Sequence, residues 1–536
     1  MRAASSGAGD AGDAATGARA IIAPMLPLAE LLGALSLATD LGAGLPLETS
    51  LRTCRVATHL GARLGLGGGE LAAVYYAGLL RHLGCTAWSH EAAALVGDDH
   101  DLIRTFEGVD DARPAAVAGR ALGRLARGAS PGRRARAVAA ALVRPGAGRR
   151  LIAAQCAQAE AFAADLGLVP ASREALAQMY ERHDGRGGPA RLRGEQIAPA
   201  ARLVHAAQVI EALHRQIGRD GTVAELRRRR GGQLAPAICD LATADAGALW
   251  RLLEAPAAFE AALAEEPAPR RAIEPGQLAA TALAFARFAD LKTPATVGHA
   301  PEVARLAAVA ARALGAPAEE LERLHLAALL HDLGAVSVAN AVWDHPGPLG
   351  AAAWEQVRLH AYHTERILAR AAATAPLAAI AGAHHERLDG SGYHRGARAA
   401  ALSRPARVLA AADAFAAMCE RRAHRGPRAD AAVELAAEAA AGRLCRDAVA
   451  AVLAAAGHGR VRPSLPAGLT EREAEVLGLV ARGLQSKEIA RQLGIATRTV
   501  KHHIEHIYEK TGVSTRAAAA LFAARHDLVA PPTGGA

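Results

Sequence analysis

The amino-acid sequence predicts an all-α protein built from several helical domains. Apolar residues make up 51% of the chain, yet only 3% of the residues are aromatic, and alanine fills the deficit. Alanine has the highest helix propensity and lets helices pack closely, which favours helices over sheets. A chain of 536 residues is too long for one core, because compact domains usually contain about 100 to 200 residues. We therefore expect about three helical domains.

The chain contains an internal repeat. The segment "YYAGLLRHLG" at 75–84 matches "HLAALLHDLG" at 325–334, at an offset of 250 residues. Farther along, "YERHDGRGGP" at 180–189 matches "HERLDGSGYH" at 385–394, at an offset of 205 residues. Similarity at a fixed offset indicates a repeated structural unit. The repeat predicts two copies of one helical fold, the first of which carries 45 additional residues.

The repeat also sets the expected domain boundaries. The first copy should span residues 25–265 and the second 270–458, because an alanine- and proline-rich segment separates them. Residues 1–24 contain mostly small and polar residues and should be disordered. A linker at 459–468 then leads to a C-terminal domain at 469–531.

Cellular compartment and redox chemistry follow from the N-terminus and the cysteines. Pro24, Pro27 and Glu30 interrupt the apolar stretch nearest the N-terminus, so we expect a cytoplasmic protein that does not bind a membrane. The six cysteines are scattered and form no C-x-x-C pair. They indicate neither a thiolate zinc site nor a disulfide framework.

The formal net charge of +9 is unevenly distributed. Ten arginines and no acidic residue lie between Arg113 and Arg150, inside the interval where the first copy carries its additional residues. A solvated surface in an arginine-rich composition is the favoured interpretation, and a nucleic-acid site is the alternative. The net charge alone therefore does not identify a nucleic-acid partner.

Histidine and aspartate residues recur through the second copy. Any one of them alone would be an ordinary surface or hydrogen-bonded residue, but together they form a set of metal donors. They are His299, His331, Asp332, His360, His384, His385 and Asp413. Imidazole and carboxylate donors suit two divalent transition ions such as Fe, Mn, Zn or Ni. Asp332, next to His331, can bridge both ions, and we expect it to be the essential catalytic residue.

These motifs resemble the HD-GYP family of metal-dependent phosphohydrolases, a branch of the HD superfamily. The resemblance covers residues 290–420 and rests on "HDLG" at 331–334, "HHERLDGSGYHRG" at 384–396 and "AADAFAAM" at 411–418. It implies that all seven residues are metal ligands. It also implies a substrate loop that contains Asp389, Gly390, Gly392 and Tyr393. Members typically hydrolyse cyclic di-GMP, so the resemblance implies a cyclic dinucleotide ligand, whose phosphodiester a metal pair can clamp and hydrolyse.

Two positions depart from the pattern of this family. The family usually has a lysine directly after "HDxG", and here that residue is Ala335. The lost contact is worth about 1.5 to 3 kcal/mol, or about ten- to a hundredfold in rate. The Gly-Tyr-Pro triplet of the family reads Gly392-Tyr393-His394, which replaces a rigid residue by a titratable one. This second departure leaves the choice of substrate open.

The first copy lacks the ligands of the second. At the two offsets, His299 corresponds to Thr49, His331 and Asp332 to Arg81 and His82, His384 and His385 to Met179 and Tyr180, and Asp413 to Gln208. Such a site cannot hold two cations, although "DGRGGP" at 184–189 retains the loop. We predict a degenerate copy that serves as a structural, dimerising or ligand-sensing domain in a homodimer.

The C-terminal domain contains helix signals in close succession. Thr470 and Glu473 fit a capping box for a first helix that ends near Arg482. Ser486 is placed to cap a second helix, and Gly494 allows the tight turn that follows it. These signals predict short helices joined by tight turns.

A third helix in this domain is amphipathic. Val500, Ile504 and Ile507 repeat on one face, while Lys501 and Glu505 lie on the opposite face. Residues 469–520 closely resemble a four-helix LuxR-type helix-turn-helix domain, in which such a helix enters the major groove of double-stranded DNA. The resemblance implies that Lys501, His502 and Glu505 face the bases and that Thr497, Arg498 and Thr499 approach the backbone. Ala496 replaces the usual capping serine, and Thr497 is the alternative cap.

The sequence supports three functional hypotheses. The favoured one is a DNA-binding transcriptional regulator whose second copy binds a metal pair and senses or slowly hydrolyses a cyclic dinucleotide or related phosphoester. A second is an active cyclic di-GMP phosphodiesterase that its helix-turn-helix localises to DNA. A third is a non-catalytic metal or nucleotide sensor, which the loss of lysine at Ala335 favours over the second.

Overall fold

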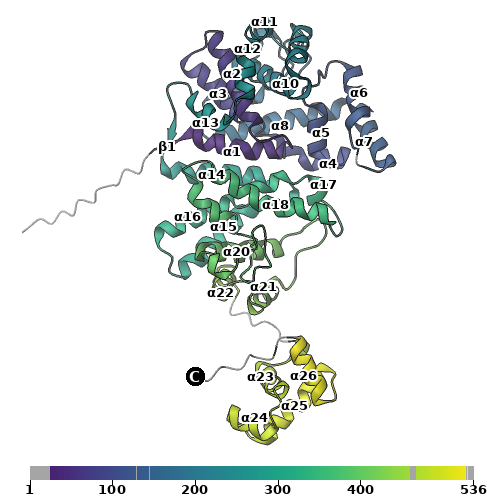
Figure 1. Ribbon diagram of the computed structural model, residues 1–536, viewed down its shortest axis with the longest axis vertical. Helices are drawn as coiled ribbons and strands as arrows, with labels where there is room; N and C mark the ends of the chain where they lie inside the picture. The colour runs from purple at the N-terminus through teal and green to yellow at the C-terminus, as the bar shows by residue number, and fades with distance from the viewer. Residues whose placement is uncertain (1–24, 128, 144, 459–465, 527, 529–536) are drawn as a thin grey trace, which may run out of the picture.

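The computed structural model describes residues 25–127, 129–143, 145–458, 466–526 and 528, and it is helical throughout, as predicted (Figure 1). Within those ranges, the strands are β1 (Leu26–Pro27) and β2 (Ala272–Ile273), which pair antiparallel. The predicted disorder at 1–24 lies outside the described residues, as do most of the predicted linker and residues 529–531. In the described part of the chain, no helix is long and apolar enough to cross a membrane.

The first half begins at α1 and ends at α13. Its helices are α1 (Leu28–Gly42), α2 (Thr49–Arg63), α3 (Gly68–Leu79), η1 (Cys85–Trp88), α4 (Ser89–Val96), α5 (Asp99–Phe106), α6 (Pro114–Arg124), α7 (Pro131–Val143), α8 (Pro145–Asp165), α9 (Pro170–Ala177), η2 (Gly194–Gln196), α10 (Pro199–Arg229), α11 (Pro236–Ala244), α12 (Ala246–Glu254) and α13 (Ala258–Ala264). The elements labelled η are short 3-10 helices.

The second half and the C-terminal unit follow β2. The helices of the second half are α14 (Pro275–Asp290), η3 (Pro294–Thr296), α15 (His299–Ala313), α16 (Ala318–Leu330), η4 (Leu333–Ser337), α17 (Asn340–Trp343), α18 (Ala351–Leu368), α19 (Ala375–Ala381), η5 (Ala399–Ala401), α20 (Arg404–Cys419), α21 (Ala431–Ala440) and α22 (Arg446–Ala455). Those of the C-terminal unit are η6 (Pro466–Gly468), α23 (Glu471–Ala481), α24 (Ser486–Leu493), α25 (Thr497–Thr511) and α26 (Arg516–Arg525).

The two halves pack against each other around one continuous hydrophobic core. Helix α1 contacts η4 and α18 of the second half, and α8 contacts α14. A buried polar network crosses the same junction. Lys292 Nζ, on a residue only 1% exposed, donates to Asp99 Oδ2 at 2.5 Å, and the Asn340 backbone N–H donates to Asp99 Oδ1 at 2.9 Å. Because a buried charge without its partner is costly, this pair fixes how the halves meet.

Corresponding residues of the two halves make the same backbone contacts. Asp40 accepts from the Ser50 N–H at 3.0 Å, and Asp290, which lies 250 residues later, accepts from the Ala300 N–H at 3.2 Å. The loop repeats as well. Glu181 accepts from the N–H groups of Ala190 and Leu192, and Glu386 accepts from those of Arg395 and Ala397. These contacts support the repeat and both of its offsets.

Two glycines mark the same close approach in each half. A Cβ added to Gly84 would lie 2.1 Å from the carbonyl oxygen of Gln155, and one added to Gly334 would lie 2.1 Å from that of His360. Gln155 therefore corresponds to His360, a position that the sequence comparison did not assign. The 45 additional residues of the first half consequently fall between Gly84 and Gln155.

The C-terminal unit has its own core. Val476, Leu477, Ile489, Val500 and Ile507 are buried together, and partly buried apolar side chains pack around them. Its described residues form four α-helices, as predicted. Because these side chains form one contiguous core, α23 to α26 pack as one folded unit.

The helix caps of the C-terminal unit confirm one prediction and correct two. Thr470 and Glu473 form the predicted capping box at α23. The cap of α24 is Gln485, not Ser486, because the Gln485 side chain accepts from the third helical N–H while Glu488 accepts from the Gln485 N–H at 2.6 Å. Ala496 precedes α25 without a side-chain cap, so Thr497 does not take that role.

The glycine contacts predict that two glycine-to-alanine substitutions change the free energy of unfolding in opposite directions. Gly84→Ala should lower the free energy of unfolding by about 3 kcal/mol, because the new methyl group meets a backbone oxygen that cannot move independently. Gly119→Ala, on exposed α6 with open space around it, should raise the free energy of unfolding by about 0.5 kcal/mol through helix propensity. Denaturant unfolding of both variants measures the difference, and equal stabilities would contradict this packing.

Candidate metal centre and DNA-binding domain

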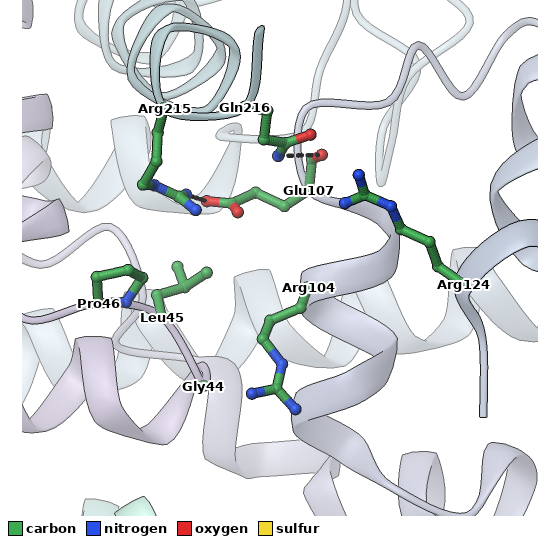
Figure 2. Close-up of a pocket in the computed structure, with 8 residues that line it drawn as sticks. All are labelled: Gly44, Leu45, Pro46, Arg104, Glu107, Arg124, Arg215 and Gln216. Carbon is green, nitrogen blue, oxygen red and sulfur yellow. Dashed lines mark hydrogen bonds and ion pairs between the residues drawn. The ribbon is translucent and has the colours of Figure 1, made fainter. Parts of the chain in front are cut away.

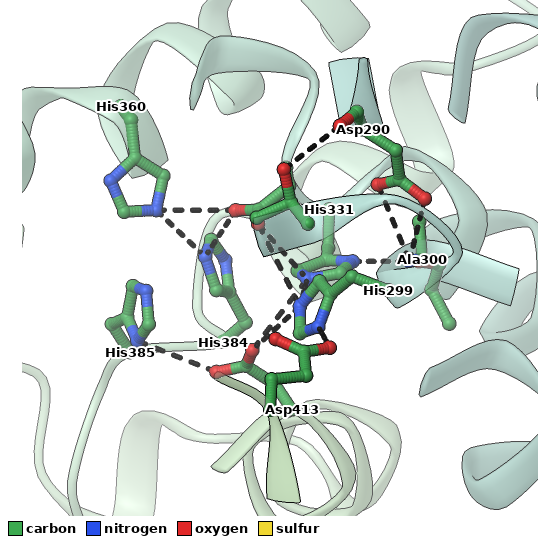
Figure 3. Close-up of polar contacts among 12 residues, drawn as sticks. Asp290, His299, Ala300, His331, His360, His384, His385 and Asp413 are labelled. Carbon is green, nitrogen blue, oxygen red and sulfur yellow. Dashed lines mark hydrogen bonds and ion pairs between the residues drawn. The ribbon is translucent and has the colours of Figure 1, made fainter. Parts of the chain in front are cut away.

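The second half brings all seven predicted ligands into one cluster (Figure 3). They come from distant points of the sequence because several helices end or pass at the same place. His299 begins α15, His331 and Asp332 follow α16, His360 lies on α18, His384 and His385 follow α19, and Asp413 lies on α20. The cluster is enclosed by the helical core, since all of these residues except Asp332 and His385 are buried.

The donors form two groups. His299, His331 and Asp332 each offer a donor atom within 4.8 Å of the others. A second group, His360, His384 and His385, satisfies the same limit. Two adjacent groups of three nitrogen or oxygen donors are the arrangement expected of a two-ion site with positions left for water and substrate.

The Asp332 carboxylate lies between these two groups. Its Oδ1 atom is 3.4 Å from Nε2 of both His360 and His384. Its Oδ2 atom is 3.7 Å from Nε2 of His331 and 3.8 Å from Nε2 of His299. Oδ1 is buried and has no hydrogen-bond partner within the described residues. This is the geometry that a bridging ligand requires.

The Asp413 carboxylate, like that of Asp332, contacts histidines of both donor groups. Its Oδ1 atom is 3.3 Å from His299 Nε2 and 3.7 Å from His331 Nε2. Its Oδ2 atom is 3.5 Å from His385 Nδ1. The two carboxylates therefore supply two negative charges to the centre of the cluster.

Backbone carbonyls orient three of the imidazoles in the same way. His331 Nδ1 lies 2.7 Å from the Ala328 oxygen, His384 Nδ1 lies 2.6 Å from the Ala381 oxygen, and His360 Nδ1 contacts the Val357 oxygen. A neutral imidazole that donates from Nδ1 presents an unprotonated Nε2. The Nε2 atoms of His360 and His384 then face each other at 3.0 Å, and a cation between them removes the repulsion of their lone pairs. The donor set thus fits a divalent metal.

The electrostatic environment of the cluster keeps its two carboxylates ionised. Burial raises the pKa of Asp332, but His331, His360 and His384 outweigh it and hold that pKa well below its usual value. Burial likewise raises the pKa of Asp413, and His385, His299 and His331 bring it well below the usual range. Carboxylates that stay ionised are ready to coordinate a cation.

Glu420 is a functional candidate that sequence reasoning missed. Its Oε1 atom lies 2.7 Å from His299 Nδ1, on the side of the ring opposite the cluster atom Nε2. A carboxylate behind a ligand histidine fixes the orientation of the ring and raises its basicity. Glu420 lies seven residues after Asp413, two turns along the same helix direction, and this spacing was the available signal.

The predicted substrate loop divides into two parts. Tyr393 lies at the cluster, with its ring centroid 4.7 Å from that of His385. Gly392 makes this possible, because a Cβ there would lie 2.5 Å from the His385 oxygen. Asp389 is exposed and accepts from the Ser391 N–H at 2.9 Å, while Gly390 adopts a φ of +84°. Asp389 and Gly390 therefore shape the loop, and Tyr393 is its member beside the donors.

The two departures from the family pattern also lie near the cluster. Ala335 is buried on η4, and its carbonyl accepts from Trp343 Nε1 at 3.0 Å. His394 Nε2 lies 3.3 Å from Glu365 Oε2. The residue that replaces the proline of the triplet is thus held by a carboxylate on α18.

The corresponding positions of the first half also meet, but around an arginine. Arg81 is 1% exposed, and its Nη2 donates to Gln208 Oε1 at 2.8 Å. The guanidinium lies 4.5 Å from the centre of the Tyr180 ring, and Nη1 contacts Met179 Sδ. Among the described residues, this group contains no metal-binding set. The positively charged guanidinium of Arg81 therefore occupies the position at which the second half has its histidine and aspartate donors.

The third helix of the C-terminal unit presents the predicted residues to solvent. Arg498, Thr499, Lys501, His502 and Glu505 are exposed on α25, and Thr497 is half-buried. Val500 and Ile507 face the core on the other side. Lys510 Nζ donates to Glu473 Oε2 at 2.7 Å, which ties α25 to α23. The polar face is therefore rigidly held and free to meet a duplex.

Comparison with known families assigns both regions. Residues 284–444 match the model described as an HD domain. Residues 467–523 match the model described as bacterial regulatory proteins, luxR family. The chain therefore joins an HD domain to a C-terminal LuxR-type DNA-binding domain. This confirms the resemblance on which the sequence interpretation rested.

Individual relatives cover both regions. The chain is 28% identical over 410 residues to 3'3'-cGAMP-specific phosphodiesterase 3 of Vibrio cholerae, covering 74% of this chain and 88% of that one. A crystal structure of a cyclic GMP-AMP specific phosphodiesterase of V. cholerae aligns with a TM-score of 0.57 and 24% identity, covering 81% of this chain and 98% of that one. The C-terminal unit is 49% identical over 61 residues to the transcriptional regulatory protein LiaR of Bacillus subtilis, covering 11% of this chain and 29% of that one.

The donor geometry predicts the metal content of the purified chain. The parent protein should contain about two transition-metal ions per chain, the number that two adjacent donor groups hold. Asp332→Ala should lose most of this metal, because both groups face its carboxylate. His345→Ala is the matched control, since His345 is an exposed histidine of the same half that is bonded to the backbone of Gly347. Elemental analysis by mass spectrometry measures all three, and equal metal in the two variants would contradict the cluster.

The exposed face of α25 predicts how the chain binds DNA. The full-length protein should bind a mixed-sequence duplex with an affinity that falls as salt is raised, because phosphate contacts release counterions. Replacing both Arg498 and Lys501 by alanine should weaken binding by about 1 kcal/mol or more. Arg323→Ala, which removes an exposed cation from α16, should leave the affinity unchanged. Fluorescence anisotropy compares them, and equal affinities would exclude α25 as the DNA-contacting helix.

Proposed function

We propose that this protein is a transcriptional regulator whose second half is a metal-dependent cyclic dinucleotide phosphodiesterase of low activity. The observation that carries the proposal is the position of Asp332 between two groups of histidines. A site of that kind, in a chain that also has a LuxR-type domain, links the chemistry of a phosphodiester to the binding of DNA. Similarity to a 3'3'-cGAMP-specific phosphodiesterase supports a cyclic dinucleotide as the substrate class.

The residues present would divide the work of hydrolysis. The seven donors would hold the metal pair. When bound, the pair supplies a water of lowered pKa and neutralises charge on the phosphodiester oxygens. Glu420 would keep the His299 ring aligned through the contact of its carboxylate with His299 Nδ1. Tyr393, whose ring lies beside that of His385, would border the substrate and set its orientation.

The rate should be low because of Ala335. No side chain at that position can place a cation beside the scissile phosphate, so charge that develops in the transition state is less well compensated. The buried environment of Ala335 makes such a contact more valuable than it would be in water. Slow turnover suits a regulator, since the protein then consumes little of the ligand to which it responds.

We assign the first half a regulatory role without metal. Arg81 fills the space between Met179, Tyr180 and Gln208 with a fixed positive charge, which repels divalent cations. The two halves share one core and a buried Lys292–Asp99 pair. A conformational change in one half would therefore alter the packing of the other. The expected homodimer and the direction of regulation belong to this proposal.

A non-catalytic sensor is the second candidate, and Ala335 is the observation that favours it. In that case the metal pair would bind the cyclic dinucleotide without cleaving it. The two candidates share the ligand and differ only in turnover. An assay that follows both binding and product therefore separates them.

Catalysis gives a third substitution test. The full-length protein should hydrolyse 3'3'-cGAMP or cyclic di-GMP slowly, and Asp332→Ala should abolish the activity because it removes a ligand shared by both metal positions. Ala335→Lys should raise the rate by about ten- to a hundredfold, the value of one charge-assisted contact. Ala352→Lys adds the same charge at an exposed position of α18 and should have no effect.

Chromatography of the nucleotide products distinguishes the outcomes of this test. Product from the parent protein that disappears in Asp332→Ala supports the enzyme. Tight binding of a cyclic dinucleotide with no product from either the parent or Ala335→Lys would replace the enzyme by the sensor. Neither binding nor product with metal-loaded protein would reject both candidates.

A further inference from the structure

A pocket separate from the metal centre lies in the first half (Figure 2). It has a volume of about 380 Å³ and is lined by Gly44, Leu45, Pro46, Arg104, Glu107, Arg124, Arg215 and Gln216. Figure 2 shows Gly44, Leu45 and Pro46 on one side of this space, with Arg104 and Arg124 across from them. Pockets for small molecules usually span roughly 300 to 1,000 Å³, so this one suits a compact ligand.

The pocket holds one paired arginine and two arginines without a close partner. Arg215 donates to Glu107 Oε1 at 2.6 Å and to Glu211 Oε1 at 3.1 Å, so two buried carboxylates face this guanidinium. Arg104 and Arg124 make no hydrogen bond or close ion pair with a residue that the structure describes, although the Asp98 carboxylate lies within Coulombic range of Arg104. Two free guanidinium groups that line one pocket favour an anion, which arginine binds through paired N–H donors.

The side of the pocket that carries Arg104 and Arg124 is formed by the additional residues of the first half. Arg104 and Glu107 lie on or directly after α5, and Arg124 ends α6. Both helices fall between Gly84 and Gln155, the interval in which the first half exceeds the second. The insertion therefore adds a wall to the repeated fold. It also gives part of the arginine-rich segment, whose role the sequence left open, a specific place.

The other wall carries a reversal of charge relative to the metal centre. Arg215 lies at the offset of 205 residues from Glu420, the carboxylate that contacts His299 in the second half. Asp332 and Asp413 correspond to the uncharged or weakly basic His82 and Gln208. The first half thus lacks the carboxylates that attract a cation in the second half. It has arginines at Arg81 and Arg215, and Arg215 is paired with Glu211, which corresponds to Ala416 of the second half.

We propose that this pocket binds the phosphate group of a small phosphomonoester, such as a nucleoside monophosphate. A dianionic phosphate matches the two free guanidinium groups of Arg104 and Arg124. Leu45 and Pro46 offer an apolar surface for the remainder of the ligand. The site would give the metal-free half a ligand of its own, independent of the chemistry of the second half.

Calorimetric titration of the full-length protein tests the proposal. Guanosine monophosphate and inorganic phosphate serve as the probes, with metal removed by chelator so that the metal centre does not contribute. The parent protein should bind at one site per chain. Replacing both Arg104 and Arg124 by alanine should weaken binding at least tenfold. Arg133→Ala is the matched control, since Arg133 is an exposed arginine of the same insertion that does not line the pocket, and it should bind as the parent does.

Each outcome decides the matter. Binding of both probes that the double variant loses supports recognition of the phosphate group. Binding of inorganic phosphate alone identifies free phosphate as the ligand, and binding of the nucleotide alone adds a contact to its nucleoside part. No binding of either probe at millimolar concentration, or equal binding by the double variant, overturns the proposal. A failure here leaves the phosphodiesterase proposal intact, because the metal centre is removed from the measurement.

Discussion

The second half is organised around the burial of polar donors that cannot satisfy one another. Five imidazoles and two carboxylates converge within an alanine-rich helical core, where unpaired lone pairs and charges are costly. Carbonyl groups three residues earlier hold the Nδ1 atoms of His331, His360 and His384, so the Nε2 atoms must face inward. Divalent cations would resolve this arrangement, and the helices α15, α16, α18 and α20 are placed to supply donors to them.

The first half meets the same constraint with a different solution. Its corresponding positions also converge, but Arg81 brings its own positive charge and is received by Gln208 and the ring of Tyr180. A fixed cation needs no carboxylates, which explains why their loss leaves the fold intact. The shared core and the buried Lys292–Asp99 pair then join a half built to bind cations to a half rich in arginine. This difference between the halves is the basis of our proposal that each half binds a different ligand.

Features that depend on residues close together in the sequence could be predicted, and features that depend on tertiary packing could not. The all-α fold, the clustering of His and Asp residues and the capping box at Thr470 follow from composition, motifs and spacing, and the structure shows each of them. The cap at Gln485 was missed because adjacent polar residues compete for it and only the backbone conformation selects one. Two-residue strands such as β1 leave no periodicity in a sequence. The contact of Glu420 with His299 and the pocket beside Arg124 depend on tertiary packing between distant segments, so local patterns could not reveal them.

We expect one repeated fold to hold metal in its second half and arginine in its first. A crystal structure of the full-length protein grown with manganese, measured at a wavelength where that metal scatters anomalously, tests this most directly. We expect two anomalous peaks, one beside each histidine group and both near Asp332, and none near Arg81. No peak at Asp332, or a peak among Met179, Tyr180 and Gln208, would contradict it.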